Sequence, residues 1–561
     1  MHSTPNVHPP QDVQTDPGDL PGGLAGIIAA RESKLAGLRA AGLDPYPTRT
    51  ERTHTTIEAV AAFEALEAGA TAANAVKTAS VTNATSEVDD PIDLSHSQAS
   101  PTLAPTPSDG PSVIAAAVEG PHDILVAGRL VGAVRLMGGS AFVHLQDGYG
   151  QLQLHLKRNR MGQEAFDQFK ALFDPGDFVC AKGSMFRTKM GEATLAVDTV
   201  TILAKSLLPL PEKWHGLQDQ ETRFRQRYLD LISNADSRAR FVKRTQVVSA
   251  MRRFLDERGF LEVETPVLQP IYGGGAAQPF TTHYNALEQT MYLRIADELY
   301  LKRMLVGGFE RVYEIAKDFR NEGIDRTHLP EFTQMECYWA YADYQDMMRL
   351  TEEMVAFVAL TVNGSHAVEI DGQAIDLSPP WRRLPVCRAI LEATGIDIEA
   401  FPDLAGLRMA MQERKLAADP HPTWAKSVDE LLSEYVEPNL LQPTFLIDYP
   451  TELSPLAKSK PGDSRYVERF EPFVAGFELG NAFTELNDPL DQRARFEAMG
   501  RQRDAGDAEA QPLDEDFLEA MMHGMPPAGG LGIGVDRLVM LITGQANIRE
   551  VVLFPQLRSA R

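Results

Sequence analysis

The spacing of apolar residues differs between regions of the chain and divides it into segments. Leu24 to Gly42 carries apolar residues at helical spacing, and we predict an N-terminal helical segment over residues 24–70. From about Arg223 onward, amphipathic helices alternate with apolar strands; one helix ends at Gly259 and is followed by LEVETPVL, a strand-like run that a proline stops. Because helices and strands interleave without a regular βαβ repeat, we predict an α+β domain over residues 225–561.

Residues 122–207 show the alternating pattern of β-strands. Five short runs of alternating apolar and polar residues are separated by Gly, Asp or Lys, and a helical stretch at Gly162 to Leu172 follows the third run. This arrangement predicts a small five-stranded β-barrel of the OB type. The proline-punctuated residues 208–224 are then a linker between the barrel and the α+β domain.

Two segments lack the pattern of a packed core. Residues 71–121 are rich in Ala, Thr, Ser, Pro and Asp, with few aromatics, and residues 1–23 are mostly polar or proline-containing. Such compositions bury too little apolar surface to offset the entropy of an ordered chain. We therefore predict a flexible low-complexity insertion at 71–121 and a disordered tail at 1–23.

Composition narrows the class of protein. The 561 residues are 43% hydrophobic and 24% charged, as in globular proteins, and no apolar run reaches the length that spans a bilayer. The N-terminus lacks the basic and apolar regions of a signal peptide. The three cysteines form no CxxC or Cys/His cluster, which fits a reduced cytoplasm and excludes a zinc site of that kind. A net charge of −24 argues against indiscriminate binding of polyanions.

The segment Glu310 to Tyr344 carries the first candidate chemistry, centred on the tetrapeptide FRNE at 319–322. It resembles motif 2 of class II aminoacyl-tRNA synthetases, and no P-loop offers another route to ATP. When a carboxylate attacks the α-phosphorus of ATP, two anions meet, and a fixed guanidinium can bind both. The resemblance implies that Arg320 is this catalytic group. The other ATP-binding residues that it implies here are Glu322 at the adenine amino group, Phe332 stacked on the base, and His328.

Two further segments resemble the remaining class II motifs. GGLGIGVDRLVMLITG, from Gly529 to Gly544, resembles motif 3, which implies that Arg537 lies over the adenine opposite Phe332. RGFLEVETPVLQP resembles motif 1, with Pro266 as its marker, and in this family that element builds a homodimer interface. The resemblance also implies a catalytic domain built on an antiparallel sheet flanked by helices.

The segment Arg469 to Asp488 resembles a signature of bacterial-type lysyl-tRNA synthetases. Glu471 and Glu478 are hard oxygen ligands that suit Mg²⁺ bridging the phosphates of ATP. TELSPLAKSK, from Thr451 to Lys460, is also similar to the lysyl branch. The resemblance implies ATP, L-lysine and tRNA(Lys) as substrates and Mg²⁺ as the cofactor.

A pocket for lysine needs an acid at its end and apolar walls. We place Glu485 against the side-chain ammonium, with the Tyr338 hydroxyl beside it, and Glu298 against the α-amino group. The remaining lysine-binding candidates are Asn481 at the carboxylate, Phe483 along the aliphatic stem, and Gly274, where main chain approaches the α-amino end. The alternative, a set of exposed acids in an acidic chain, is weakened because five acids fall at matching places.

In the family, the barrel reads the anticodon. The resemblance implies that Phe142 stacks on an anticodon base, that Gln153 reads it, and that Glu192 is a further contact. Taken as isolated residues, Phe142 would be a barrel-core aromatic and Gln153 a solvated edge.

The chain departs from the family pattern at two positions. Gln278 and Thr327 stand where the family usually has arginine, and Arg326 is a substitute for the second.

Three rival interpretations stay open. An aspartyl or asparaginyl synthetase would need a cation in place of Glu485. A lysine-activating enzyme that modifies a protein would lack the barrel. An inactive RNA-binding scaffold would have lost Arg320, the two metal candidates or Arg537.

Overall fold

The computed structural model describes residues 23–82, 120–211, 217–416, 423–504 and 511–559. The chain divides into two compact units, residues 1–214 and 215–561, and each is described by itself. Among the described residues, no helix has both the length and the apolar character needed to cross a membrane.

Unit 1 is built on a closed five-stranded barrel with strand order β1-β2-β3-β5-β4. Its β3–β5 pair is parallel and the other pairs are antiparallel. Alternate residues of each strand point inward, and Phe166 and Phe169 of α4 pack against the same core. The predicted barrel and its helical stretch are therefore confirmed. The elements are β1 Ile124–Met137, β2 Ser140–Gln146, β3 Gln151–Lys157, α3 Arg158–Met161, α4 Gln163–Leu172, β4 Phe178–Arg187 and β5 Ala193–Ala204.

Two helices precede the barrel, α1 (Gly23–Ala40) and α2 (Thr56–Thr82). Arg31 fixes α1 to the barrel unit, because its guanidinium donates to the carbonyls of Pro175 and Leu208 at 3.0 and 2.8 Å. The prediction that residues 71–82 belong to a flexible insertion is wrong, since α2 continues to Thr82. This stretch is rich in alanine, which has the highest helix propensity, so it needs no periodic apolar face to remain helical. The rest of the predicted insertion, residues 83–119, and nearly all of the predicted tail lie outside the described residues.

Unit 2 is centred on a large sheet with strand order β14-β15-β18-β20-β21-β11-β10-β6, and β19 pairs with β18. Most pairs are antiparallel; β10–β6 and β14–β15 are parallel. The predicted antiparallel sheet is thus confirmed, with two parallel pairs at its ends. The strands are β6 Leu261–Glu262, β10 Arg311–Phe319, β11 Glu331–Ala340, β14 Arg382–Pro385, β15 Thr444–Ile447, β18 Arg469–Val474, β19 Phe477–Glu478, β20 Gly480–Thr484 and β21 Ala528–Gly534.

The strand predicted over LEVETPVL is interrupted. It forms β6 at the edge of the large sheet and, after the proline, β7 (Leu268–Gln269) in a separate three-stranded sheet with β8 (Thr281–Tyr284) and β9 (Gln289–Leu293). Pro266 has no N–H to donate, and the N–H and hydroxyl of Thr265 both donate to the Glu314 carboxylate, at 3.0 and 2.7 Å. The donors that would continue the strand are therefore used elsewhere.

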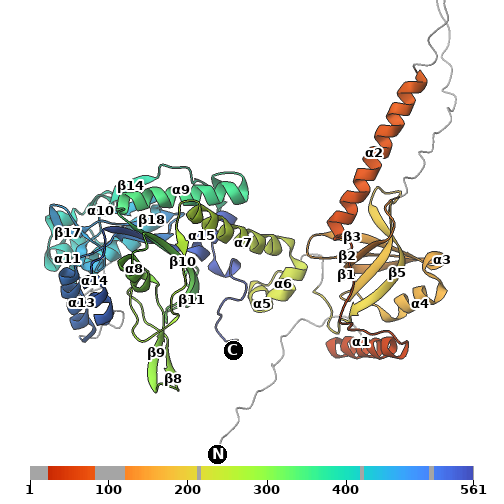
Figure 1. Ribbon diagram of the computed structural model, residues 1–561, viewed down its shortest axis with the longest axis horizontal. Coiled ribbons are helices and arrows are strands. Elements are labelled where there is room, and N and C mark those ends of the chain that lie inside the picture. The colour runs from red at the N-terminus through yellow and green to blue at the C-terminus, as the bar shows by residue number, and fades with distance from the viewer. Residues whose placement is uncertain (1–22, 83–119, 212–216, 417–422, 505–510, 560–561) are drawn as a thin grey trace, which may run out of the picture. The chain divides into compact units, whose positions relative to one another are not determined.

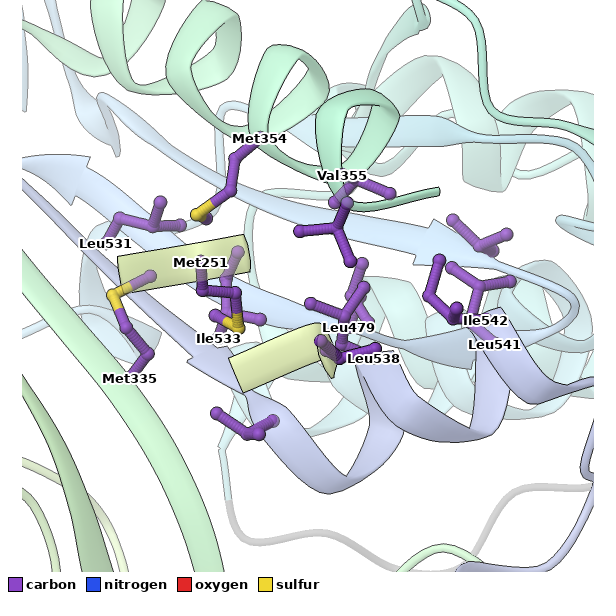
Figure 2. Packing of buried hydrophobic residues seen from close by; sticks show 14 of the residues in the cluster. Met251, Met335, Met354, Val355, Leu479, Leu531, Ile533, Leu538, Leu541 and Ile542 are labelled. Carbon is purple, nitrogen blue, oxygen red and sulfur yellow. The ribbon is translucent and has the colours of Figure 1, made fainter. Parts of the chain in front are cut away.

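Helices α7 (Ala235–Asp256), α9 (Tyr344–Asn363) and α15 (Val535–Thr543) pack together against the large sheet (Figure 1). Met251 of α7, Met354 of α9 and Leu538 of α15 meet Met335 of β11 and Ile533 of β21 in one buried cluster (Figure 2). This layer holds the strands that carry the candidate site.

The remaining elements include α5 Gln220–Arg225, α6 Arg227–Ser233, α8 Glu298–Val306, β12 Ala367–Ile370, β13 Gln373–Asp376, α10 Val386–Thr394, α11 Leu404–Glu413, α12 Trp424–Leu431, β16 Ser459–Lys460, β17 Asp463–Val467, α13 Pro489–Asp504 and α14 Glu515–Met522, with short helical turns at Ile398–Ala400, Leu432–Val436, Glu437–Asn439, Thr451–Leu453 and Ile548–Glu550.

Candidate active site

One cavity of about 390 Å³ in unit 2 brings together almost every candidate for ATP, metal and lysine binding. Its walls come from the β10–β11 hairpin, the strands β18 to β20, the junction of β21 with α15, and the loop around residue 274. The candidates that line it are Gly274, Glu298, Arg320, Glu322, His328, Phe332, Tyr338, Glu471, Glu478, Asn481, Phe483 and Arg537. Glu485 is the one member of the predicted set that does not line it.

Arg320 lies directly after β10, at the start of the loop that leads to β11. Its Nε donates to the Ile295 carbonyl at 3.3 Å, and its guanidinium carbon lies 5.2 Å from the centre of the Phe332 ring. A Cβ at Gly275 would lie 3.7 Å from Arg320 Nη2, in ordinary van der Waals contact. The guanidinium is thus oriented by one carbonyl and one ring, and Arg320 lines the cavity.

Arg537, in the first turn of α15, joins two walls of the cavity. Its Nη1 donates to the carbonyl and Oε2 of Glu478 at 2.7 and 3.0 Å, and its Nη2 lies 2.8 Å from His328 Nε2. His328 belongs to the exposed loop after Arg320, as does Glu322. Phe332 therefore faces Arg320 in this structure, and Arg537 faces the His328 loop.

Glu471 and Glu478 lie on the β18–β19 hairpin and provide two carboxylates on one wall. Glu471 accepts hydrogen bonds from Tyr449 Oη at 2.8 Å and from Arg469 Nη2 at 2.5 Å. Burial, with the nearby Glu478 charge, raises the pKa of Glu471 to about 7 against the opposing effect of Arg469. The described residues contain no group of three metal-binding side chains, so any metal here would rely on oxygen atoms of a bound phosphate as well.

Two buried acids, Glu298 and Glu336, also line the cavity. Glu298 opens α8, and Tyr338 of β11 donates to Glu336 Oε2 at 3.0 Å. Glu336 is 3% exposed and lines the cavity, and no Lys or Arg among the described residues lies within ion-pairing distance of it. Burial, together with the charges of Asp318 and Glu298, raises the pKa of Glu336 well above its usual value. The site therefore contains an acid that is not stabilised by a protein cation.

The sequence reasoning missed Glu336. The signal was present, because residues two apart on a strand share a face, and Tyr338 was already assigned to the pocket. Behind Glu336 lies a second unpredicted cluster, in which Arg294 contacts Asp297, Glu314 and Asp318 at 3.0, 2.8 and 3.3 Å. Glu314 and Asp318 both lie on β10, whereas Arg294 and Asp297 lie in the segment before α8, so the cluster forms only when these segments pack together.

Glu485 lies just beyond β20 and is fully buried. It forms an ion pair with Lys302 of α8, which also contacts Glu298 Oε1 at 2.5 Å. Glu485 is separated from the cavity only by Gly530, because a Cβ at that glycine would come within 1.9 Å of Glu485 Oε1. The predicted lysine acid is therefore next to the pocket and already has a cationic partner.

The other lysine candidates also line this cavity. Asn481 Oδ1 accepts from Arg469 Nε at 2.8 Å, and Phe483 provides an apolar surface. Gly274 has φ +85°, and its N–H donates to Gln511 Oε1 at 2.9 Å. A Cβ at Gly274 would be 3.0 Å from Glu298 Cβ, so glycine is needed for the loop to approach this acid.

The two departures from the family pattern contact the site mainly through their main chains. The Gln278 carbonyl accepts from Asn321 N at 2.7 Å, the Thr327 carbonyl accepts from Arg537 Nε at 3.4 Å, and the Thr327 hydroxyl lies 3.2 Å from His328 Nδ1. The carbonyl of Arg326 accepts from Ile548 N. Because a carbonyl is present in every residue, these carbonyl contacts do not require the arginines that the family pattern has.

On unit 1, the three anticodon candidates share the outer face of the barrel. Phe142 stacks on His155 with ring centres 4.3 Å apart and planes within 1°. Gln153 Nε2 donates to Glu192 Oε2 at 2.6 Å. Inward positions on β2 are taken by Ala141 and its alternate neighbours, so the interpretation of Phe142 as a core aromatic is wrong.

A five-stranded barrel occurs here together with a sheet domain whose cavity is lined by an arginine and buried acids, and both parts match known protein families. Residues 219–558 match the tRNA synthetases class II (D, K and N), and residues 124–203 match the OB-fold nucleic acid binding domain. The chain is 53% identical over 528 residues to a "Lysine--tRNA ligase" of Roseiflexus castenholzii, covering 94% of this chain and 98% of that one. A "Lysine--tRNA ligase" of Chloroflexus aurantiacus is 52% identical over 535 residues, 95% of this chain and 99% of the relative. The chain belongs to the lysine–tRNA ligase family.

The close approach at Gly530 leads to a prediction. Gly530→Ala should lower lysine-dependent ATP–pyrophosphate exchange and the melting temperature, because the new Cβ overlaps Glu485 Oε1 and lies 2.7 Å from the Tyr338 ring. Gly534→Ala on the same strand is the matched control, since its Cβ would meet Arg537 at an ordinary 3.6 Å. Equal behaviour of the two variants would contradict the assigned packing.

Proposed function

We propose that the chain activates L-lysine with ATP through the cavity of unit 2 and transfers the lysyl group to tRNA(Lys). The observation that carries the proposal is the charge of one cavity, which is lined by Arg320 and by the buried acids Glu298 and Glu336. Buried carboxylates favour an amino acid that carries two ammonium groups. The membership in the lysine–tRNA ligase family agrees with this assignment.

In the bound substrate, the lysine side chain lies along Phe483 with its ammonium at Glu336, Tyr338 and Glu485, and the α-ammonium is at Glu298. Asn481 positions the carboxylate, and the main chain at Gly274 approaches the α-ammonium. The carboxylate oxygen then attacks the α-phosphorus of ATP, a P–O bond forms, and the bond to the pyrophosphate oxygen breaks. Arg320 stabilises the charge on the reacting oxygens. The terminal hydroxyl of tRNA subsequently attacks the lysyl carbonyl, and AMP leaves.

Glu471 and Glu478 fit Mg²⁺, because two carboxylates with phosphate oxygens are a usual ligand set for this ion. The raised pKa of Glu471 supports this assignment, since a bound cation would favour the ionised carboxylate. Mg²⁺ supplies neutralisation of phosphate charge. On the adenine side we assign Phe332, Glu322, His328 and Arg537, which line the cavity beyond Arg320.

In the barrel, Phe142, Gln153 and Glu192 form the proposed anticodon contact. The Phe142–His155 stack leaves an aromatic surface on the outer face, where a base can stack without entering the core. The adjacent Gln153–Glu192 pair offers donors and acceptors for the edge of that base.

We also propose a homodimer in the cytoplasm. Exposed apolar side chains gather around the edge strand β6 and β7, among them Leu261 and Leu268, which are about half exposed. An edge strand with such neighbours suits burial against a second copy. The three cysteines are free, as expected for a reducing compartment.

Arg320→Ala should abolish adenylate formation while the protein stays folded. Loss of a charge-assisted contact made mainly in the transition state costs about 3–4 kcal/mol, or at least a hundredfold in rate. The measurement is lysine-dependent pyrophosphate exchange, with the melting temperature as the folding control. Wild-type exchange in a well-folded variant would refute the role of Arg320.

Phe142→Ala should raise the KM for tRNA in the charging assay, because a stacking contact worth about 1–3 kcal/mol is lost. Pyrophosphate exchange should be unchanged, since it needs no tRNA. Tyr149→Ala is the matched control, because Tyr149 is an exposed aromatic of the same unit outside the proposed contact. An unchanged tRNA KM for Phe142→Ala would count against anticodon stacking at this ring.

A further inference from the structure

Lys302 is a buried cation that the proposed mechanism does not use. It lies on α8 with no exposed surface, and its Nζ contacts Glu298 Oε1 at 2.5 Å and forms an ion pair with Glu485. The Nζ also lies 5.3 Å from the centre of the Phe483 ring. All three of these neighbours belong to the proposed lysine pocket, so the position of Lys302 affects several of its walls at once.

A count of the charges around Lys302 shows what it does to the pocket. When lysine is bound and all three acids are ionised, Glu298, Glu336 and Glu485 supply three negative charges, and Lys302 supplies one positive charge. Arg469 also influences Glu298, but it forms an ion pair with Glu471.

The other charges behind the pocket belong to a separate cluster. The charge of Asp318 raises the pKa of Glu336, whereas the Asp297 N–H donates to Glu336 Oε1 at 3.4 Å, and Arg294 is the cationic partner of both aspartates. Tyr338 is a hydrogen-bond donor to Glu336, and burial raises the pKa of Tyr338, so it stays uncharged. Once the three acids are ionised, they and Lys302 leave a surplus of two negative charges, which equals the number of ammonium groups on lysine.

We propose that Lys302 is a positioning residue that determines amino-acid specificity by pairing with both Glu298 and Glu485 and by limiting the lysine-bound pocket to a surplus of two negative charges. The inference rests on the proposed function and deepens it. Glu298 and Glu485 come from different elements, and one ammonium between them fixes both carboxylates at the distance that the pocket requires. Lysine then completes the charge balance with its two ammonium groups.

The ionisation of the acids supports this role. Burial raises the pKa of Glu485 to about 8 even with Lys302 beside it, and the pKa of Glu298 is raised as well. Lys302 lowers the pKa of both carboxyls against the effect of burial, so without its ammonium both would be harder to ionise when lysine binds. The two acids in turn raise the pKa of Lys302 and oppose the effect of burial, so it remains charged.

The test compares Glu485→Gln with the double variant Lys302→Met/Glu485→Gln in the full chain. In Glu485→Gln, Lys302 neutralises Glu298, and only one acid remains for two ammonium groups. Removing Lys302 as well restores the surplus of two. The double variant should therefore have a lower lysine KM than Glu485→Gln, by about tenfold, as expected for residues in direct contact. The KM for ATP should stay within about twofold.

Lys302→Met alone should raise the lysine KM by about tenfold or more, because it leaves buried carboxylates without their cation. If this single variant does not fold, the comparison above still decides, since removing both partners of a buried pair is tolerated better than removing one. Lys205→Met is the matched control: Lys205 is also fully buried between two carboxylates, Asp174 and Asp177, but in unit 1. It should lower the melting temperature and leave the lysine KM unchanged.

A lysine KM in the double variant equal to or above that of Glu485→Gln would overturn the inference and make Lys302 a packing residue. The proposed function has a separate test in the same assay. If the wild-type chain gives no lysine-dependent exchange, the proposed function fails whatever the variants do. If the wild type is active and the double variant shows no recovery, only the role of Lys302 fails.

Discussion

The surplus of buried acid in the cavity is the constraint on which the site depends. Glu336 is nearly inaccessible, lines the cavity and has no protein cation within reach among the described residues. Keeping such a carboxylate ionised in a dry site is costly unless a cation arrives. Burial therefore favours the protonated carboxyl in the free protein, and a ligand with an ammonium group stabilises the ionised form, which favours lysine over neutral or acidic amino acids.

The fold makes that charge arrangement possible by holding it on rigid strands. β11 carries Glu336 and Tyr338, and β21 passes beside them with glycines that leave space for side chains on both neighbours. The layer of α7, α9 and α15 packs against these strands and fixes their positions (Figure 2). Arg320 lies on the loop after β10 and lines the same cavity as these acids.

Much of this organisation could be predicted from the sequence, because local patterns encode it. Period-two alternation predicted the barrel, and contiguous motifs placed Arg320, Glu471 and Arg537 around one cavity. The rest depends on contacts between distant segments. Lys302 meets Glu485 only after α8 and β20 have packed together, and the Arg294 cluster joins β10 to the segment before α8. The helical extension of α2 was missed for another reason, since alanine-rich sequence has no apolar periodicity to detect.

The central claim, that lysine neutralises buried acid in the pocket, is tested most directly by counting protons released on lysine binding. Burial keeps the pKa of Glu336 high in the free protein, and a bound ammonium lowers it, so the carboxyl must lose its proton when lysine binds. Calorimetric titration near pH 7 in buffers of different ionisation enthalpy should show net proton release, and lysine affinity should increase as the pH rises from 6 to 8, by up to about tenfold per pH unit for one linked proton. Binding without proton release, with an affinity independent of pH over this range, would contradict the account.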